Sequence, residues 1–143
     1  MPYKFLEGLT MADIAFEASG KTLEELFISA ADAVTNTQIQ DLKEIKTLVD
    51  KEFSLEAADE EKLLHNFLQE LIFLKDSELL LFREYELKIK KAGKGYVLTA
   101  KAKGEKLDPK RHTLLADVKA VSWHMFKIEK IAKGWKATVI IDV

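Results

Sequence analysis

Two aspartates near the ends of the chain have the residue type and the setting of a metal site. Asp13 lies on the polar side at the start of an alternating segment, residues 13–19, which predicts a strand with one buried face. Asp142 is the penultimate residue and adjoins the α-carboxylate of Val143. If the two strand ends are neighbours, three oxygen anions converge there. Such a set suits Ca²⁺ or Mg²⁺ and, without adjacent His or Cys, suits zinc poorly. The alternative is a group of solvated acids that bind nothing.

Three histidines are the other candidates for chemistry. His65 adjoins the apolar stripe of a predicted helix, which favours a helix-surface or boundary position. His112 follows residues 104–109, an expected loop, and loops carry binding residues more often than cores do. A plain surface histidine is the simpler interpretation. His124 follows Trp123 in a predicted strand, so we expect the two side chains on opposite faces, with His124 as a hydrogen-bonded structural residue.

Basic residues crowd the segment 88–111, where nine Lys and Arg stand against two acidic residues. They are Lys88, Lys90, Lys91, Lys94, Lys101, Lys103, Lys106, Lys110 and Arg111, against Glu105 and Asp108. Such a patch suits phosphates or an acidic protein surface. RNA binding usually adds exposed aromatic side chains for stacking, and this hairpin offers only Tyr96. Solvated strand faces are the simpler interpretation.

The composition narrows the class of protein. The chain has 143 residues, 48% of them hydrophobic, and a net charge of -2, which predicts one globular domain over residues 1–143 whose bulk charge names no partner. With no cysteine, it has no thiol nucleophile, thiolate metal site or disulfide. Phosphate-binding-loop, zinc-protease and serine-hydrolase motifs are absent from the sequence. Signal sequences and membrane-span-length apolar runs are absent too, so we expect a cytoplasmic protein with no membrane partner and no catalytic activity of its own.

The periodicity predicts two amphipathic helices and several strands. Residues 22–25 have the spacing of a capping box at the start of one helix with an apolar stripe. Asp59 can cap a second amphipathic helix. Strands are expected at 13–19, within 43–55, in a hairpin that turns at 93–95, at about 118–131 and at 135–143. This order predicts an α+β fold in which both helices pack on one side of a mainly antiparallel β-sheet.

Five segments resemble the archease family. Residues 11–14, Met-Ala-Asp-Ile, followed by 20–27 resemble its opening, in which a strand with an ADI-type motif leads into the first helix. Residues 104–112 and 118–124 resemble the family's GE-x-x-D-x-x-x-H and VKA-x-(T/S)-aromatic-H signatures. The ending, 134–143, is similar as well, so the resemblance runs through the chain in order.

The resemblance implies an archease-like fold and an accessory protein of an RtcB-type RNA ligase. Such a protein promotes GTP-dependent guanylylation of the ligase and its repeated turnover, in tRNA splicing or RNA repair. The chemistry is then the ligase's, and tRNA or RNA is an indirect partner. The family's divalent-metal site, with Ca²⁺ expected first and Mg²⁺ as the alternative, maps to Asp13, Asp142 and Val143. Five further residues are implied to line or support a working surface: Glu105, Asp108, His112, Lys119 and His124.

One departure from the family concerns the residues before the ADI motif. Archeases usually carry His-Thr there, whereas this chain has Thr10 and Met11. If that histidine contributes to function, the departure predicts a weakened or specialised protein.

Two other functions stay open from the residues themselves. One is an RNA-binding or chaperone-like module that acts through the basic hairpin, residues 88–111. The other is a metal-dependent hydrolase that uses Asp13 and Asp142 with His112 or His124.

Overall fold

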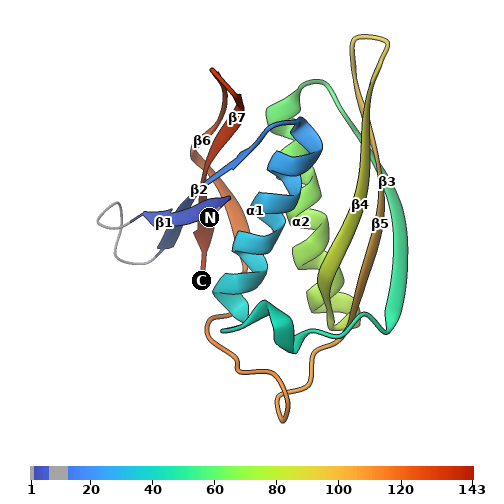
Figure 1. Ribbon diagram of the computed structural model, residues 1–143, viewed down its shortest axis with the longest axis vertical. Coiled ribbons are helices and arrows are strands. Elements are labelled where there is room, and N and C mark those ends of the chain that lie inside the picture. The colour runs from blue at the N-terminus through green and yellow to red at the C-terminus, as the bar shows by residue number, and fades with distance from the viewer. Residues whose placement is uncertain (1, 7–12) are drawn as a thin grey trace.

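The computed structural model describes residues 2–6 and 13–143, and it places two helices between a four-stranded and a three-stranded sheet (Figure 1). The elements in chain order are β1 (Tyr3–Leu6), β2 (Asp13–Gly20), α1 (Leu23–Gln38), the 3-10 turn η1 (Leu42–Glu44), β3 (Val49–Ala57), α2 (Glu60–Glu78), β4 (Leu80–Ala92), β5 (Gly95–Lys106), β6 (Ala120–Ile131) and β7 (Gly134–Asp142).

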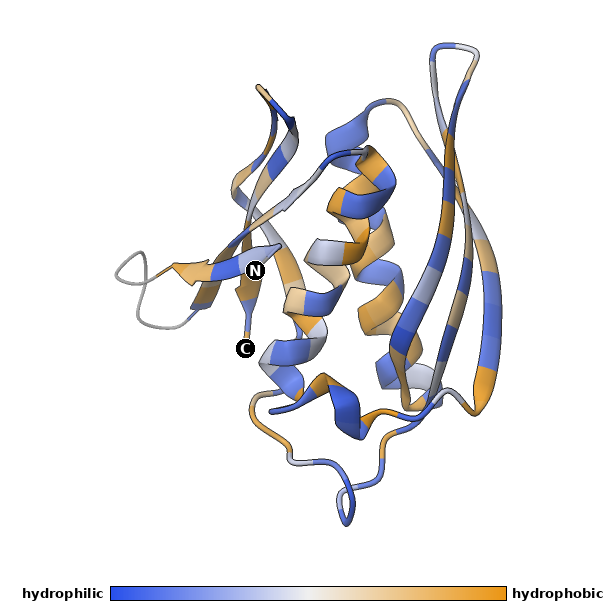
Figure 2. Ribbon diagram, in the orientation of Figure 1, coloured by the Kyte–Doolittle hydropathy of each residue, from blue (hydrophilic) through white to orange (hydrophobic). Residues whose placement is uncertain are grey.

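The strands form two antiparallel sheets with the orders β1-β2-β7-β6 and β3-β5-β4. The predicted α+β class, with two helices and antiparallel strands, is confirmed. The strands nevertheless divide between two sheets, one on each side of the helices, where one sheet was expected. The physical reason is that both helices are apolar on two sides, so each sheet covers one side of the helix layer (Figure 2).

Both helices begin at the predicted caps. The Thr22 hydroxyl accepts the Glu25 N–H (3.1 Å) and the Glu25 carboxylate accepts the Thr22 N–H (3.2 Å), which completes the capping box of α1. The Asp59 carboxylate accepts the Lys62 N–H (2.8 Å) at the start of α2. Helix α2 ends at Leu79, which has left-handed backbone angles (φ 59°, ψ 29°). In the described ranges, neither helix is long and apolar enough to cross a membrane.

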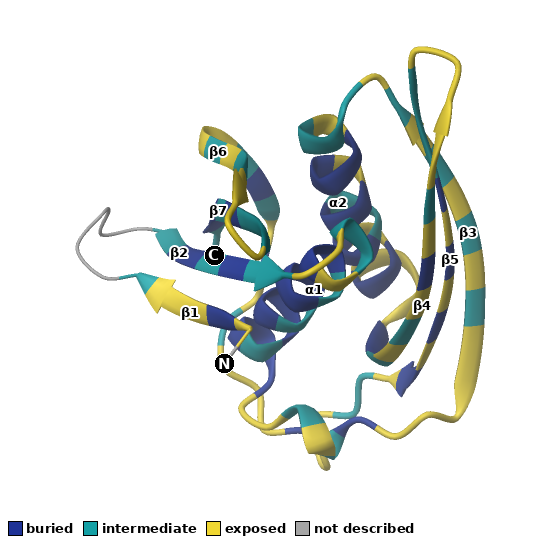
Figure 3. Cartoon of the chain, turned by 45° about the horizontal axis from the view of Figure 1, so that its top comes forward, coloured by how far each residue is buried: buried dark blue, intermediate teal, exposed yellow. Residues whose placement is uncertain are grey.

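The core lies between the sheets, where the helices meet the inner faces of the strands (Figure 3). Phe67 of α2 stacks on Phe27 of α1 with ring centroids 5.7 Å apart and on Phe53 of β3 at 6.2 Å. These contacts join α1, α2 and the three-stranded sheet into one apolar cluster, so the strand positions on either side are fixed by a common core.

The predicted loop over residues 104–109 begins later than expected. Strand β5 continues through Gly104 and Glu105 to Lys106, because Gly104 packs against β4 where a Cβ atom would overlap the carbonyl oxygen of Leu81. The β4–β5 register shifts at the next residues of β4, between Phe82 and Glu84. The loop that leads to β6 therefore starts after residue 106.

Candidate functional site

Asp13 and Asp142 lie directly opposite each other. Strands β2 and β7 are antiparallel with Asp13 paired to Asp142 and Ile14 paired to Ile141. Ile141 belongs to the buried core, and the half-buried Ile14 packs against it. Because side chains alternate along a strand, the two aspartates share the opposite face of the sheet, away from the helices. The structure thus meets the condition on which the predicted carboxylate site depended, that the two strand ends be neighbours.

The electrostatics of this pair disfavour two negative charges. Burial raises the pKa of Asp142, and the hydrogen bond and the charge of the Asp13 carboxyl raise it further. Two adjacent carboxyl groups cannot both ionise without a repulsive cost. A bound cation would remove that cost, since it favours the ionised form of each.

Two more predicted residues adjoin the pair. The Lys119 N–H donates to the Asp142 carbonyl oxygen (2.8 Å), and the Lys119 side chain is exposed beside the end of β7. Val143 follows Asp142, and its half-buried side chain packs against the core. The backbone of Val143 is therefore anchored directly after Asp142.

The donor set is short of side-chain ligands. In residues 2–6 and 13–143, no group of three or more His, Cys, Asp or Glu side chains is placed to hold one metal ion. Asp13 and Asp142 supply two carboxylates, and the third anion of the predicted site is the α-carboxylate of Val143. An all-oxygen set fits a hard divalent ion that keeps part of its water shell, as Ca²⁺ and Mg²⁺ do. Thr10 and Met11 lie outside the described residues.

A second predicted group, Glu105, Asp108 and His112, lies at the start of the loop between β5 and β6. Glu105 is 4% exposed, and its carboxylate accepts hydrogen bonds from the Lys46 N–H (2.6 Å), from His112 Nε2 (3.0 Å) and from Arg111. Burial raises the pKa of Glu105, but these hydrogen bonds and the Arg111 charge outweigh it and hold the pKa below its usual value.

His112 has no nitrogen left for catalysis or metal binding. Its Nδ1 accepts the Asp108 N–H (2.8 Å), so its Nε2 carries the proton that is donated to Glu105. The Asp108 carboxylate accepts the Lys110 N–H (3.0 Å), which closes the turn. This group fixes the loop, and no hydrogen bond or ion pair joins it to Asp13 or Asp142 in the part of the chain that is described. The expected surface histidine at 112 is wrong, because the side chain is 3% exposed.

Strand β6 contains a wide bulge. Its register with β7 shifts between Ser122 and Lys127, so residues 123–126 stand out of the ladder, and we call them the β6 bulge. Within it Met125 has a positive φ of 57°. His124 is exposed, and its N–H donates to the Ser122 hydroxyl (3.0 Å). His124 is therefore an exposed residue of the bulge, and its place in a working surface stays a prediction.

The outer edge of β6 is covered by one stripe of α2. The Glu61 carboxylate accepts the Ile128 N–H (2.8 Å), His65 Nε2 donates to the Val121 carbonyl oxygen (2.9 Å), and the Gln69 amide oxygen accepts the Val121 N–H (2.5 Å). These three residues are four apart, so they line one face of the helix. Burial lowers the pKa of His65, against the opposing effect of its hydrogen bond to Val121. The expected surface or boundary position of His65 was wrong, because it is 8% exposed.

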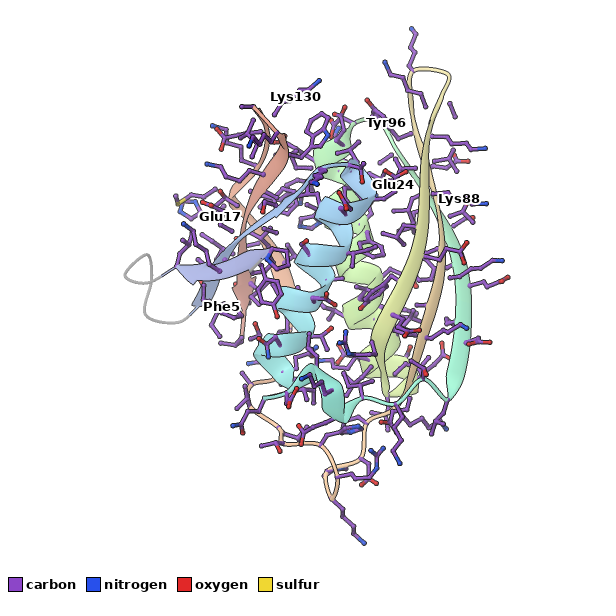
Figure 4. All side chains as sticks on the ribbon, in the orientation of Figure 1. Phe5, Glu17, Glu24, Lys88, Tyr96 and Lys130 are labelled. Carbon is purple, nitrogen blue, oxygen red and sulfur yellow. The ribbon has the colours of Figure 1, made fainter. Side chains whose placement is uncertain are left out.

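The basic hairpin does not form a continuous positive surface. On the outer face of the three-stranded sheet, two lysines each lie between two carboxylates. These cross-strand rows are Asp50–Lys103–Glu84 and Glu52–Lys101–Glu86. Lys88 points away from the helices, whereas the Tyr96 hydroxyl donates to Glu60 of α2 (2.5 Å) (Figure 4). The one aromatic ring expected for base stacking is therefore tied to a helix.

Sequence reasoning missed the contribution of α2 to this end of the molecule. A polar residue every fourth position, Glu61, His65 and Gln69, within a largely buried helix was the available signal. It indicates polar groups that must find partners inside the protein, and the exposed edge of β6 provides them.

Comparison with known proteins places these features in a family. The archease protein family (MTH1598/TM1083) matches residues 3–143. A protein archease of Pyrococcus abyssi is 43% identical over 137 residues, which cover 92% of this chain and 93% of that protein. A protein archease of Methanopyrus kandleri is 34% identical over 143 residues, covering 100% of both chains.

Two solved structures share the fold. The solution structure of Methanobacterium thermoautotrophicum protein 1598 has a TM-score of 0.86 at 32% identity and covers 99% of each chain. The crystal structure of a Thermotoga maritima archease, described as a possible chaperone, has a TM-score of 0.62 at 24% identity and covers 94% of this chain and 93% of that one.

Proposed function

We propose a function from the premise that this chain belongs to the archease protein family. The protein is an accessory factor that activates an RtcB-type RNA ligase. It promotes the GTP-dependent guanylylation of the ligase and its multiple turnover, in tRNA splicing or RNA repair. The ligase carries out the chemistry, and tRNA or RNA is a partner only through it.

The opposition of Asp13 and Asp142 is the observation that carries this proposal. Family resemblance points to these two residues from separate ends of the chain, and the β2–β7 register brings them to the same face of one sheet. Asp13, Asp142 and the α-carboxylate of Val143 would hold the divalent ion. Ca²⁺ is the expected ion and Mg²⁺ the alternative. When bound, the ion supplies fixed positive charge. The exposed Lys119 adds a second cation beside it, so this sheet end offers a charged surface to an acidic or phosphate-bearing partner.

The test is guanylate transfer from labelled GTP to the cognate ligase at substoichiometric amounts of this protein. We expect several ligase molecules to be charged per wild-type molecule, and Asp13→Ala and Asp142→Ala to abolish the stimulation. Glu17→Ala is the matched control, since Glu17 lies on the same face of β2 and pairs only with exposed Lys4 (3.8 Å) in the described structure. Full stimulation by both aspartate variants would overturn the metal site, and no stimulation by folded wild type would overturn the proposal.

The alternative function is an RNA-binding or chaperone-like module that acts through the basic hairpin. It is favoured by the lysine excess over residues 88–111 and by the description of the Thermotoga maritima archease as a possible chaperone. The carboxylates beside Lys101 and Lys103 weaken the RNA version. Electrostatic binding would fall steeply with salt. A salt-sensitive RNA association that is lost on reversal of Lys88 and Lys90 would favour this alternative.

A further inference from the structure

An open cavity of about 510 Å³ lies beside the N-terminal half of helix α1. Its walls come from one side of that helix, from the end of β2, from the turn between β6 and β7, and from Pro2 (Figure 1). Its lining includes Gly20, Lys21, Ile28, Asp32, Ile131 and Lys133. A volume of this size is typical of sites for small molecules. Neither Asp13 nor Asp142 lines it, so the cavity is separate from the carboxylate pair.

The walls of this cavity are held in close contact with one another. A Cβ atom on Gly20 would lie 2.4 Å from the Leu26 nitrogen, and one on Gly134 would lie 2.2 Å from the Gly20 carbonyl oxygen. The Ser29 hydroxyl donates to the Ser19 carbonyl oxygen (2.8 Å), which joins α1 to the end of β2. The cavity is therefore formed before any ligand arrives, and binding need not order its walls.

Asp32 lines the cavity with a carboxylate that lacks partners in the described structure. One of its oxygens is buried without a hydrogen bond, and burial raises its pKa against the opposing charge of Arg83. The neighbouring Glu25 differs, because its carboxylate already accepts the N–H groups of Lys21 (2.9 Å) and Thr22 (3.2 Å). A partly buried carboxylate without a partner costs free energy, and a ligand with charged N–H donors would remove that cost.

Two lysines bring positive charge to the same cavity. Lys21 and Lys133 both line it, and both are exposed. Neither ammonium group pairs with a carboxylate in residues 2–6 and 13–143. Ile28 and Ile131 add apolar lining. The cavity thus offers one acidic group, two basic groups and an apolar wall to a single occupant.

These groups favour a ligand that carries both signs of charge. A purely anionic ligand would be repelled by the Asp32 carboxylate, and a purely cationic ligand would be repelled by the two lysines. A metal ion would find one free carboxylate, whereas hard divalent ions take several oxygen ligands. A zwitterion can pair with Asp32 and with the lysines at the same time.

We propose that this cavity binds a small zwitterion, with its primary ammonium group on Asp32 and its carboxylate or phosphate group on Lys21 and Lys133. Ile28 and Ile131 cover the aliphatic part of the molecule between its charged ends. This inference goes beyond the proposed function and does not rest on it, because it concerns a different site and needs no ligase.

The test is calorimetry on the full-length protein at pH 7.5 with two probes, 6-aminohexanoate and 4-aminobutyl phosphate. We expect saturable binding of one molecule per chain. Hexanoate and hexylamine, which each lack one of the two charges, should bind about tenfold more weakly or not at all. The probe that binds more tightly identifies the anionic group, carboxylate or phosphate, that the lysines prefer.

Variants locate the bound probe. Asp32→Asn keeps the size of the side chain but removes its charge, and it should weaken binding of both probes about tenfold. Lys133→Gln should weaken binding as well, while leaving the ammonium contact in place. Lys94→Gln is the matched control, since Lys94 is an exposed lysine in the turn between β4 and β5 and should bind as wild type does. Thermal unfolding shows that each variant is folded.

Three results would overturn the inference. One is the absence of saturable binding by both probes. Another is binding that Asp32→Asn and Lys133→Gln leave unchanged, which would place the probe elsewhere. The third is hexylamine that binds as tightly as 6-aminohexanoate, because the lysines would then have no role. Guanylylation of the ligase is not part of this test, so the proposed function can fail or succeed independently.

Discussion

Glu105 and His112 hold the two ends of a turn together inside the protein. The carboxylate accepts from His112 Nε2 at 3.0 Å while it also accepts the N–H of Lys46 from the segment before β3. One buried side chain thereby ties β5, the loop after it and the approach to β3. The residues of the GE-x-x-D-x-x-x-H segment form a structural unit, and the pair of Asp13 and Asp142 lies elsewhere, at the β2–β7 ends.

Replacement of Glu105 should be severely destabilising. Glu105→Ala leaves the Lys46 N–H and His112 Nε2–H as donors without acceptors in a buried site, at a cost of about 3 kcal/mol. Urea unfolding followed by circular dichroism measures this loss. Glu86→Ala, on the exposed face of β4, should change stability by less than about 0.5 kcal/mol. Equal stabilities for the two variants would contradict the structural role of Glu105.

Asp32 on α1 predicts an unusual pH dependence. One of its carboxylate oxygens is buried with no hydrogen-bond partner among the described residues, and burial raises its pKa to about 6, against the opposing charge of Arg83. The folded protein therefore holds this proton more tightly than the unfolded chain does. The stability of the folded protein therefore falls as the pH rises through the window from 3.8 to about 6. Above this window the free-energy cost of holding an ionised Asp32 in the folded protein is fully present.

Asp32→Asn should remove this cost. We expect the variant to be more stable than wild type by about 1–2 kcal/mol at pH 7.5, a figure reduced from the full shift because the carboxyl is partly exposed. The difference should shrink toward zero at about pH 3, below the ordinary pKa of 3.8. Thermal unfolding at both pH values tests this. A constant difference at both would mean that ionisation of Asp32 carries no free-energy cost in the folded protein.

The helix starts could be predicted because their determinants are local. Thr22 with Glu25, and Asp59, satisfy amide groups within one turn, so spacing alone identifies them. The division into two sheets could not be predicted, because it depends on the pairing of β3 with β5, which α2 and β4 separate in the sequence. The opposition of Asp13 and Asp142 could be stated only as a condition, since nothing local specifies that β2 and β7 are neighbours.

The β6 bulge shows a second limit. Alternation along a regular strand places Trp123 and His124 on opposite faces, but in the bulge four residues of β6 lie against one of β7, which breaks the alternation. The contact of Trp123 with His65 then depends on the packing of α2 against the strand edge. The hydrophobic periodicity of the sequence carries no information on which side chain of α2 meets which side chain of β6.

Leu79 offers a simple stabilising change. It ends α2 with a φ of 59° and is 52% exposed, so its side chain gains little packing in exchange for a strained backbone. Leu79→Gly should raise the unfolding free energy by about 0.5–1 kcal/mol, and Leu79→Asn by less. Denaturant midpoints of the three proteins provide the comparison. A loss of stability in the glycine variant would show that the Leu79 side chain contributes more packing than its exposure indicates.

Gly104 should tolerate no side chain. A Cβ there would overlap the carbonyl oxygen of Leu81, which belongs to the backbone of β4 and cannot move without breaking the ladder. Gly104→Ala should cost more than about 3 kcal/mol or prevent folding. Gly93→Ala, at an open turn with a φ of 60°, should cost only about 1 kcal/mol. Soluble yield and unfolding midpoints rank the two, and the reverse order would refute the close approach of β4 to β5.

Calcium should stabilise the folded protein through Asp13 and Asp142. A ligand that binds only the folded state at a hundredfold excess over its Kd adds about 2.7 kcal/mol, so the thermal midpoint of wild type should rise as Ca²⁺ is added. Asp13→Asn should lose most of this rise, and without Ca²⁺ it should be no less stable than wild type, because its amide no longer repels Asp142. Glu17→Gln should respond as wild type does. The same rise in all three proteins would place any bound Ca²⁺ elsewhere.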